Sequence, residues 1–329
     1  MKLTLFSAKP YDIRFFEETN PGHDLRFLNV HLDETTAGLV AGAEAVCLFV
    51  NDNANAGVVR LLAAAGVRLL ALRCAGFNNV DLAACRRHGI RVVRVPAYSP
   101  FSVAEHTIAL ILTLNRKTHR AYNRVKEGNF SLDGLMGFDL HGQTAGLLGL
   151  GTIGKATARI LNGFGCRVLA HDPFPDDEAA RLGIDYVGLD DLLTQSDIIS
   201  LHCPLTPDTH HLLNRHTLRR TKPGVMIINT GRGALIDTPA LIEALKDEHI
   251  GYVGLDVYEE EADLFFEDLS AQIIKDDAFM RLLTFPNVLI TGHQAFFTRN
   301  ALHAIAQTTF DNLRAFETGA ELVNEVKAA

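Results

Sequence analysis

Short apolar runs alternate with amphipathic stretches along almost the whole of this 329-residue chain. The apolar runs have the length of strands, for example 3–6, 45–50, 68–71 and 197–201, and the segments between them, such as 56–65, have helical spacing. Strands that are joined by helices pair in parallel, so this order predicts an α/β fold. The chain is too long for one ordinary domain and predicts two.

Charge and cysteine content narrow the possible functions. Lys and Arg number 31 against 39 Asp and Glu, a net charge of −8, so we expect no nucleic acid partner. No apolar run reaches the ~18 residues of a membrane span, and the start of the chain lacks a signal-peptide pattern, which predicts a cytoplasmic protein without a membrane partner. The cysteines are widely spaced, form no C-x-x-C pair and indicate reduced thiols rather than disulfides or a metal site: Cys47, Cys74, Cys85, Cys166 and Cys203.

Two prolines mark the first boundary along the chain. Pro96 and Pro100 restrict the backbone and disfavour a helix before them, so residues 1–100 are expected to form one small α/β unit. A long helix is predicted over 102–117, before a second unit of strands and helices. The last predicted helix, 301–315, is expected to return and pack on the first unit.

A glycine-rich turn follows the predicted strand at 144–148. Gly149, Gly151 and Gly154 form the pattern G-x-G-x-x-G, and the helix after it is expected to be apolar on one face. Asp172 ends the next strand, 18 residues after Gly154, where a carboxylate binds ribose hydroxyls and repels a 2′-phosphate. The pattern therefore predicts NAD rather than NADP. The alternatives are a glycine-rich turn without ligand and a turn role for Asp172 beside Pro173. The predicted apolar face comprises Ile153, Ala156, Ile160, Leu161 and Phe164.

Polar or small residues follow four later strands. These strand ends are 202–204, 229–232, 256 and 291–293. In an open parallel sheet, ligands bind outside the carboxyl ends of the strands, so the four ends are expected to line one crevice. Between them, Thr238 before a proline predicts the N-cap of a helix.

The residues at these strand ends suit the reduction of a keto acid. Hydride transfer to a ketone needs a proton donor, and histidine titrates near neutral pH, so His293 is the candidate acid and base. Glu261 is the candidate carboxylate on its other ring nitrogen. Arg232 can hold a substrate carboxylate through two parallel hydrogen bonds. Spacing alone leaves open that the run 259–261 is solvated, that Arg232 is an ordinary loop arginine and that Asp256 only caps the next segment.

Several segments together resemble the D-isomer-specific 2-hydroxyacid dehydrogenase family. The segments are 103–107, the glycine turn with Asp172, 229–233, 255–259 and 292–295. The resemblance covers nearly the whole chain, and it implies that Arg232, Glu261 and His293 are catalytic. Asp256 matches the family's cofactor-side aspartate.

The resemblance also implies the remaining site residues. The substrate carboxylate would be held by the backbone N–H groups of Ala75 and Gly76 and by Tyr98, together with Arg232 and His293, and Phe49 and Phe296 would line the side-chain pocket. The nicotinamide side would use Thr230, Gly231, Arg232 and Asp256. Phosphate or adenosine would be contacted by Thr152, Ile153, Cys203, Pro204 and Thr209.

The architecture that the resemblance implies is a pair of Rossmann-like or flavodoxin-like domains with a cleft between them. Residues 1–100 and 299–329 would form a discontinuous substrate domain, and residues 101–298 an inserted NAD-binding domain. The helix at 102–117 resembles the segment that these enzymes use for dimer contacts, which implies a homodimer or a homotetramer.

Within the family, the stretches 264–268 and 289–298 look like those of the lactate-specific members. The implied reaction is the reversible, NADH-dependent reduction of pyruvate to D-lactate. Two alternatives stay open: a preference for a bulkier 2-keto acid such as phenylpyruvate or 2-ketoisocaproate, and an NAD(H)-sensing protein without turnover.

Overall fold

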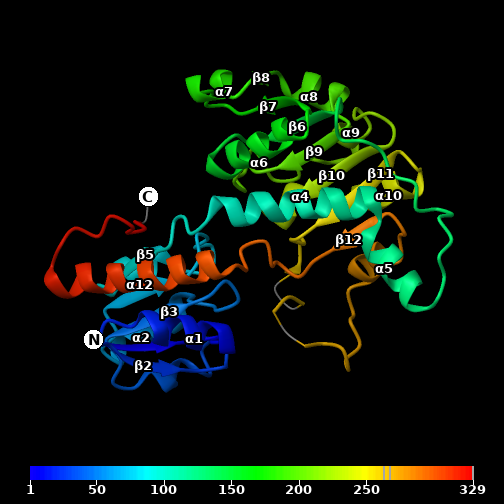
Figure 1. The fold of residues 1–329 in the computed structure, drawn as a ribbon. Coiled ribbons are helices and arrows are strands. Elements are labelled where there is room, and N and C mark those ends of the chain that lie inside the picture. The colour runs from blue at the N-terminus through cyan, green and yellow to red at the C-terminus, as the bar shows by residue number, and fades with distance from the viewer. Residues whose placement is uncertain (262–263, 267, 328–329) are drawn as a thin grey trace. The chain divides into compact units, whose positions relative to one another are not determined.

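A computed structural model describes residues 1–261, 264–266 and 268–327. The chain divides into two compact units (Figure 1). Unit 1 comprises Met1–Ser99 and Phe297–Ala329, and unit 2 comprises Pro100–Phe296. The prediction from the sequence put the boundaries after residues 100 and 298. The first helix of unit 2 begins at Pro100 itself, because proline at the first helical position lacks only an N–H that would be unpaired there anyway.

Unit 1 is a five-stranded parallel sheet with the order β2-β1-β3-β4-β5. This is the flavodoxin-like strand order. The central strands β3 and β4 are buried on both faces and read AVCL and LLAL, as expected of strands that helices cover on each side. Its strands are β1 Lys2–Leu5, β2 Asp24–Phe27, β3 Ala45–Leu48, β4 Leu69–Leu72 and β5 Arg91–Arg94. Its helices are α1 Pro10–Thr19, η1 Ala37–Val40, α2 Ala56–Ala64, α3 Leu82–Arg87 and α12 Arg299–Thr318.

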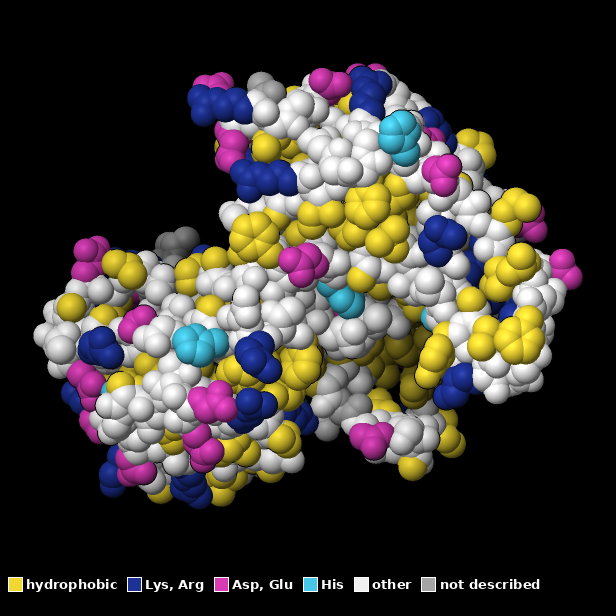
Figure 2. Space-filling view, in the orientation of Figure 1, with side chains coloured by type: hydrophobic (Ala, Val, Ile, Leu, Met, Phe, Trp, Pro, Cys, Tyr) yellow, Lys and Arg dark blue, Asp and Glu magenta, His cyan; other side chains and the backbone are white. Residues whose placement is uncertain are grey.

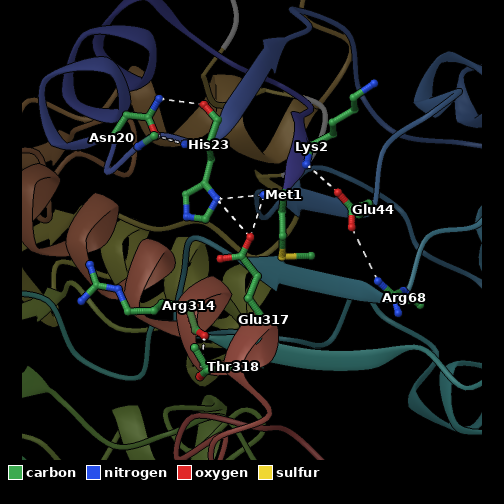
Figure 3. Close-up of polar contacts among 10 residues, drawn as sticks. Met1, Lys2, Asn20, His23, Glu44, Arg68, Arg314, Glu317 and Thr318 are labelled. Atoms are coloured by element: carbon green, nitrogen blue, oxygen red, sulfur yellow. Dashed lines mark hydrogen bonds and ion pairs between the residues drawn. The ribbon is translucent and has the colours of Figure 1, made fainter.

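Helix α12 returns to unit 1, as the sequence predicted, and packs against α1, β4 and β5 (Figure 1). An ion pair fixes its C-terminal end: the amino group of Met1 donates to Glu317 Oε1 at 2.7 Å (Figure 3). His23 stacks on Phe310 with ring centroids 5.5 Å apart, and burial lowers the pKa of His23. The ring of Phe297 contacts that of Tyr11 at 4.8 Å, so the chain already belongs to unit 1 before α12 begins.

Unit 2 is a seven-stranded parallel sheet with the order β12-β11-β10-β9-β6-β7-β8. Successive strands run outward from β6 to β8 on one side and from β9 to β12 on the other, so the order reverses between β6 and β9. Its strands are β6 Thr144–Leu148, β7 Arg167–His171, β8 Ile184–Tyr186, β9 Ile198–Leu201, β10 Val225–Asn229, β11 Ile250–Leu255 and β12 Val288–Ile290. Its helices are α4 Pro100–Arg116, α5 Thr118–Lys126, α6 Thr152–Gly163, α7 Asp177–Arg181, α8 Leu189–Gln195, α9 Arg215–Leu218, η2 Gly233–Leu235, α10 Thr238–Lys246 and α11 Asp277–Leu283.

Two local predictions were wrong. Helix α10 is capped by Asp237, whose side chain accepts from the N–H of Ala240, so Thr238 is the first helical residue and not the cap. On α6, Phe164 is 38% exposed, whereas Thr157 and Ala158 are buried. Phe164 is the C-cap residue, beyond the last full turn, where the helical repeat no longer turns its side chain toward the sheet.

Among the described residues, no helix combines the length and apolar character that a bilayer span requires.

Candidate active site

The glycine turn lies where the strand order of unit 2 reverses. Gly149 follows β6 with φ +94°, and a side chain on it would meet the backbone N of Cys203 at 2.5 Å. Only glycine fits this close approach of the β6 and β9 ends. The N–H of Gly149 donates to the carbonyl of His171 at 2.9 Å, which ties the turn to the end of β7 as well.

The other two glycines shape the start of α6. Gly151 is the N-cap residue, and apart from its immediate chain neighbours no atom of the described residues lies within 4 Å of where its side chain would be. A side chain on Gly154 would meet the carbonyl oxygen of Gly149 at 2.5 Å, so the helix begins directly against the turn. Thr152 and Ile153 are the first residues of α6. Unpaired N–H groups and open space at a helix N-terminus fit a pyrophosphate.

Asp172 follows β7 and faces the glycine turn. Its Oδ2 accepts from the N–H of Leu150 at 2.7 Å, and its Oδ1 accepts from the N–H of Phe174 at 2.8 Å. Each carboxylate oxygen has a second lone pair, which leaves acceptor capacity for ribose hydroxyls. Asp172 therefore shapes the turn, and its position at this strand end also fits a dinucleotide.

The loop after β9 carries Cys203, Pro204 and Thr209. Thr209 closes this loop, because its hydroxyl donates to the carbonyl of Pro204 at 2.6 Å. Burial raises the pKa of Cys203 to about 11, so its thiol stays protonated at neutral pH and is a poor nucleophile. Burial lowers the pKa of His202 to about 4, so this ring is neutral at pH 7, and its Nε2 lies 2.9 Å from the hydroxyl of Ser200.

Asn229 organises the end of β10. Its Oδ1 accepts from the N–H of Gly231 at 3.0 Å, and its Nδ2 donates to the carbonyl of Arg232 at 2.9 Å. Thr230 is buried, with its hydroxyl 3.0 Å from that of Thr107 on α4. The Arg232 guanidinium donates through Nη1 to the carbonyl of Gly231 at 2.8 Å. In the described part of the chain its other nitrogens have no acceptor, so they are available to a carboxylate.

Asp256 follows β11 and is completely buried. It accepts from the hydroxyl of Thr291 at 2.5 Å and from the N–H groups of Gln294 and Ala295 at 2.9 and 2.7 Å. His106 Nε2 lies 3.3 Å from Asp256 Oδ1. Asp256 thus fixes the path of the chain after β12. This role goes beyond capping the next segment, which was the alternative that the sequence left open.

His293 follows β12 and faces Glu261. The two atoms Nδ1 of His293 and Oε1 of Glu261 lie 2.8 Å apart, and Glu261 Oε2 accepts from the N–H of Tyr258 at 3.0 Å. The backbone of His293 has φ +50°, which is uncommon for a residue with a side chain. Its N–H donates to the carbonyl of Asp256 at 2.7 Å, and this bond holds the unusual conformation.

Two phenylalanine rings flank the imidazole. The Phe266 ring lies 5.5 Å from that of His293, and the Phe296 ring lies 6.4 Å away at 83°. Phe296 is buried in unit 2. Of the predicted motif at 264–268, Glu267 lies outside the described residues.

Four predicted substrate residues lie in unit 1, all after the carboxyl ends of its strands. Phe49 follows β3, and the guanidinium of Arg73 lies 4.8 Å from the centre of its ring. Ala75 and Gly76 follow β4, and Tyr98 follows β5. The carbonyl of Ala75 accepts from Arg94 at 2.8 Å. Neither the Ala75 nor the Gly76 N–H donates a hydrogen bond within the described chain.

Reasoning from the sequence missed the supporting roles of His106, Thr107 and Asn229. All three lay within segments that were used only as family signatures, 103–107 and 229–233. Their partners are on other elements of the fold, so no local sequence pattern predicts these contacts.

Comparison with known proteins agrees with this geometry. The family model described as D-isomer specific 2-hydroxyacid dehydrogenase, NAD binding domain, matches residues 108–295. The chain belongs to the D-isomer-specific 2-hydroxyacid dehydrogenase family. The resemblance seen in the sequence is therefore confirmed, and so are the two parallel-sheet α/β domains and NAD as the cofactor.

Full-length relatives of this 2-hydroxyacid dehydrogenase are known. A D-lactate dehydrogenase of Escherichia coli is 54% identical over 328 residues, which cover 99% of this chain and 100% of the relative. The apo-structure of D-lactate dehydrogenase from Escherichia coli matches with TM-score 0.92 and 52% identity, covering 99% of this chain and 100% of that chain. D-lactate dehydrogenase from Aquifex aeolicus, complexed with NAD and lactic acid, matches with TM-score 0.88 and 34% identity over 100% of both chains.

Proposed function

We propose that this chain is a D-lactate dehydrogenase that reduces pyruvate with NADH and runs in reverse with D-lactate and NAD. The observation that carries the proposal is the 2.8 Å contact between His293 Nδ1 and Glu261 Oε1 beside the end of β12. A histidine held by a carboxylate is the acid and base that this reaction needs. The name of the relative that is 54% identical supports pyruvate and D-lactate as the substrate pair.

His293 supplies and takes up the proton. With Nδ1 occupied by Glu261, Nε2 is the atom that protonates the developing alkoxide during reduction and accepts the hydroxyl proton during oxidation. Glu261 fixes the tautomer and stabilises the imidazolium form. It is itself held by the N–H of Tyr258, so the pair is oriented before substrate binds.

Arg232 binds the substrate carboxylate and polarises the carbonyl. One of its nitrogens is anchored on the carbonyl of Gly231 at 2.8 Å, which limits the freedom of the guanidinium. Binding then costs less side-chain entropy than it would for an unanchored arginine. A second carboxylate grip from the Ala75 and Gly76 N–H groups and from Tyr98, and a pocket wall of Phe49 and Phe296, stay predictions. Within the described residues the N–H groups of Ala75 and Gly76 donate no hydrogen bond, which supports their part in the carboxylate grip.

NAD, when bound, carries the hydride. We propose that Gly149, Gly151, Gly154, Thr152 and Ile153 hold its pyrophosphate and that Asp172 accepts from its adenosine ribose. Cys203, Pro204 and Thr209 would lie on the adenosine and phosphate side. Thr230, Gly231, Arg232 and Asp256 would lie on the nicotinamide side. Unit 2 is then the NAD-binding domain and unit 1 the substrate domain.

Exposed apolar side chains support a homo-oligomer. They lie on α5 and on the segment after it, where Figure 2 shows hydrophobic side chains gathered. Such a patch on a chain of this type is covered most simply by a second copy. The residues are Tyr122, Val125, Phe130, Leu132 and Met136, exposed by 64%, 53%, 75%, 81% and 87%.

The five cysteines are all free, which supports a cytoplasmic location.

Steady-state oxidation of NADH with a panel of keto acids tests the proposal. The panel is pyruvate, phenylpyruvate, 2-ketoisocaproate, glyoxylate and hydroxypyruvate. We expect the highest kcat/KM with pyruvate. We also expect that an assay specific for D-lactate detects the product and that an assay specific for L-lactate does not. A clear preference for phenylpyruvate or 2-ketoisocaproate would replace lactate with a bulkier substrate. NADH binding without turnover on any member would instead indicate a sensing protein.

A further inference from the structure

Next to the site described above, but sharing none of its residues, His210, His211 and Glu259 lie together in unit 2. Each offers one ligand atom, and these three atoms all lie within 4.8 Å of one another. His210 is exposed, whereas His211 and Glu259 are half-buried. The last two come from segments 48 positions apart in the sequence, so the fold and not the local sequence assembles this group.

The backbone at His211 brings two consecutive rings to the same side. In an extended chain, neighbouring side chains point in opposite directions. His211 has φ +50°, and as a result its ring stacks on that of His210 with centroids 3.9 Å apart and planes at 26°. The N–H of His211 donates to the carbonyl of Ala234 at 2.8 Å, which anchors this conformation.

The half-buried pair is already in position. His211 Nε2 lies 2.6 Å from Glu259 Oε1, and Glu259 Oε2 accepts from the N–H of Thr238 at 3.3 Å. The carboxylate is thus held from one side by the first residue of α10 and from the other by the imidazole. An ion that binds there displaces the proton between these two atoms, moves them apart to the roughly 3.4 Å that tetrahedral ligands of Zn²⁺ need, and orders the exposed ring of His210. The fold has already brought the two half-buried ligands together, which lowers the cost of arranging them.

We propose that His210, His211 and Glu259 form a site for a divalent transition-metal ion, with Zn²⁺ as the probe. Two imidazole nitrogens and one carboxylate oxygen are ligands that Zn²⁺ takes at about 2.0–2.2 Å. The three ligand atoms lie within 4.8 Å of one another, so a small movement of the exposed His210 ring would let all three reach one ion. Mg²⁺ and Ca²⁺ prefer ligand sets made of oxygen and do not match this site.

The bound ion would join two segments next to the candidate active site. His211 and Leu213 pair with the segment after Arg232, the second through its N–H to the carbonyl of Leu235 at 3.0 Å. Glu259 stands two residues before Glu261. A ligand that binds only the folded state stabilises it, so the ion raises the melting temperature.

Calorimetric titration of the full chain with ZnCl₂ tests the site. The protein carries no polyhistidine tag, is stripped with a chelator and is dialysed into a buffer that does not bind metal. We expect saturable binding in the wild type and affinity weakened by about tenfold or more in His210→Ala. His216→Ala is the matched control, because His216 is exposed on the neighbouring helix α9 and lies outside the cluster; its affinity should equal that of the wild type.

A second variant and a thermal readout guard against misfolding. Glu259→Gln keeps an oxygen that accepts from Thr238 but removes the charge, so we expect a folded protein with weakened Zn²⁺ binding. Zn²⁺ should raise the melting temperature of the wild type and of His216→Ala, and the rise should be lost in His210→Ala; Mg²⁺ should raise none of them. His293 and Glu261 are present in all these variants. Zn²⁺ binding that His210→Ala leaves unchanged would therefore place the ion elsewhere and overturn the proposal.

Discussion

His293 Nδ1 lies 2.8 Å from Glu261 Oε1, although the two residues are 32 positions apart in the sequence. Both are held by backbone groups at the end of β11: Glu261 accepts from the N–H of Tyr258, and the N–H of His293 donates to the carbonyl of Asp256. The acid–base pair is therefore built on the edge of a rigid sheet, which fixes its geometry before any ligand arrives.

Replacing His293 by alanine should remove the proton donor and leave the cofactor site intact. We expect His293→Ala to lower kcat for pyruvate reduction by about 10²–10⁴. NADH binding, measured by fluorescence titration, should stay within a few-fold of the wild type. His303→Ala, at an exposed position on α12, is the control and should keep full activity. Near-normal turnover in His293→Ala would rule out this residue as the acid.

Replacing Glu261 by glutamine tests the orientation of the imidazole. The amide keeps the size of the side chain but cannot stabilise the imidazolium, so we expect kcat to fall by between about 10 and 10⁴-fold. Steady-state oxidation of NADH with pyruvate measures this loss. A kcat for Glu261→Gln within a few-fold of the wild type would contradict the role of Glu261.

Arg232→Lys keeps the positive charge and loses the two parallel hydrogen bonds. We expect KM for pyruvate to rise by about 10–100-fold, the equivalent of a charge-assisted hydrogen bond, with a smaller change in kcat. Arg219→Lys, at an exposed position, serves as the control. A KM equal to that of the wild type would mean that Arg232 does not hold the carboxylate.

Asp172→Asn removes a charge beside the glycine turn while keeping a side-chain oxygen for the N–H of Leu150 or Phe174. Because the carboxylate repels a 2′-phosphate, we expect the ratio of kcat/KM for NADH over NADPH to fall by about tenfold or more. Asp185→Asn, exposed on the edge strand β8, should leave the ratio unchanged. Retained selectivity in Asp172→Asn would exclude the ribose contact.

His202 should make the folded protein less stable in mild acid. Its pKa is about 4 in the folded chain against an ordinary 6.5, so between these values the unfolded chain binds a proton that the folded chain does not. The free energy of unfolding then falls as pH drops from 6.5 toward 4, and this contribution is absent above 6.5. The full pKa shift corresponds to a change of about 3 kcal/mol in the free energy of unfolding. Because the side chain keeps some solvent contact, we expect a change of about 1–2 kcal/mol.

Urea unfolding of His202→Asn at several pH values measures this contribution. The difference in unfolding free energy between wild type and variant should shrink steadily as pH is lowered from 6.5 to 4. His216→Asn, whose side chain is exposed, should show the pH dependence of the wild type. A difference between wild type and His202→Asn that does not change with pH would show that burial of His202 does not couple to folding.

Local patterns decided much of the fold. The apolar runs predicted strands within one or two residues of those observed, as at β9, because strands that are buried on both faces must be apolar throughout. The edge strands β2, β5 and β8 carry polar residues, and no apolar run predicted them. Errors fell at helix ends, at Thr238 and Phe164. At α10 the neighbouring Asp237 provides the capping side chain, and at α6 the last full turn ends before Phe164; residue type alone does not locate either boundary.

By itself the sequence determined the α/β class, the glycine turn with Asp172 and the identity of the groups at the strand ends, since each depends on residue types at short, fixed spacings. Only the tertiary structure decided which of Glu259, Glu260 and Glu261 faces His293, that Glu259 pairs with His211 instead, and that Asp256, Thr291 and His106 support the site. Those choices depend on contacts between segments that are distant in the chain, and parallel pairing of β10, β11 and β12 is what brings them to one edge.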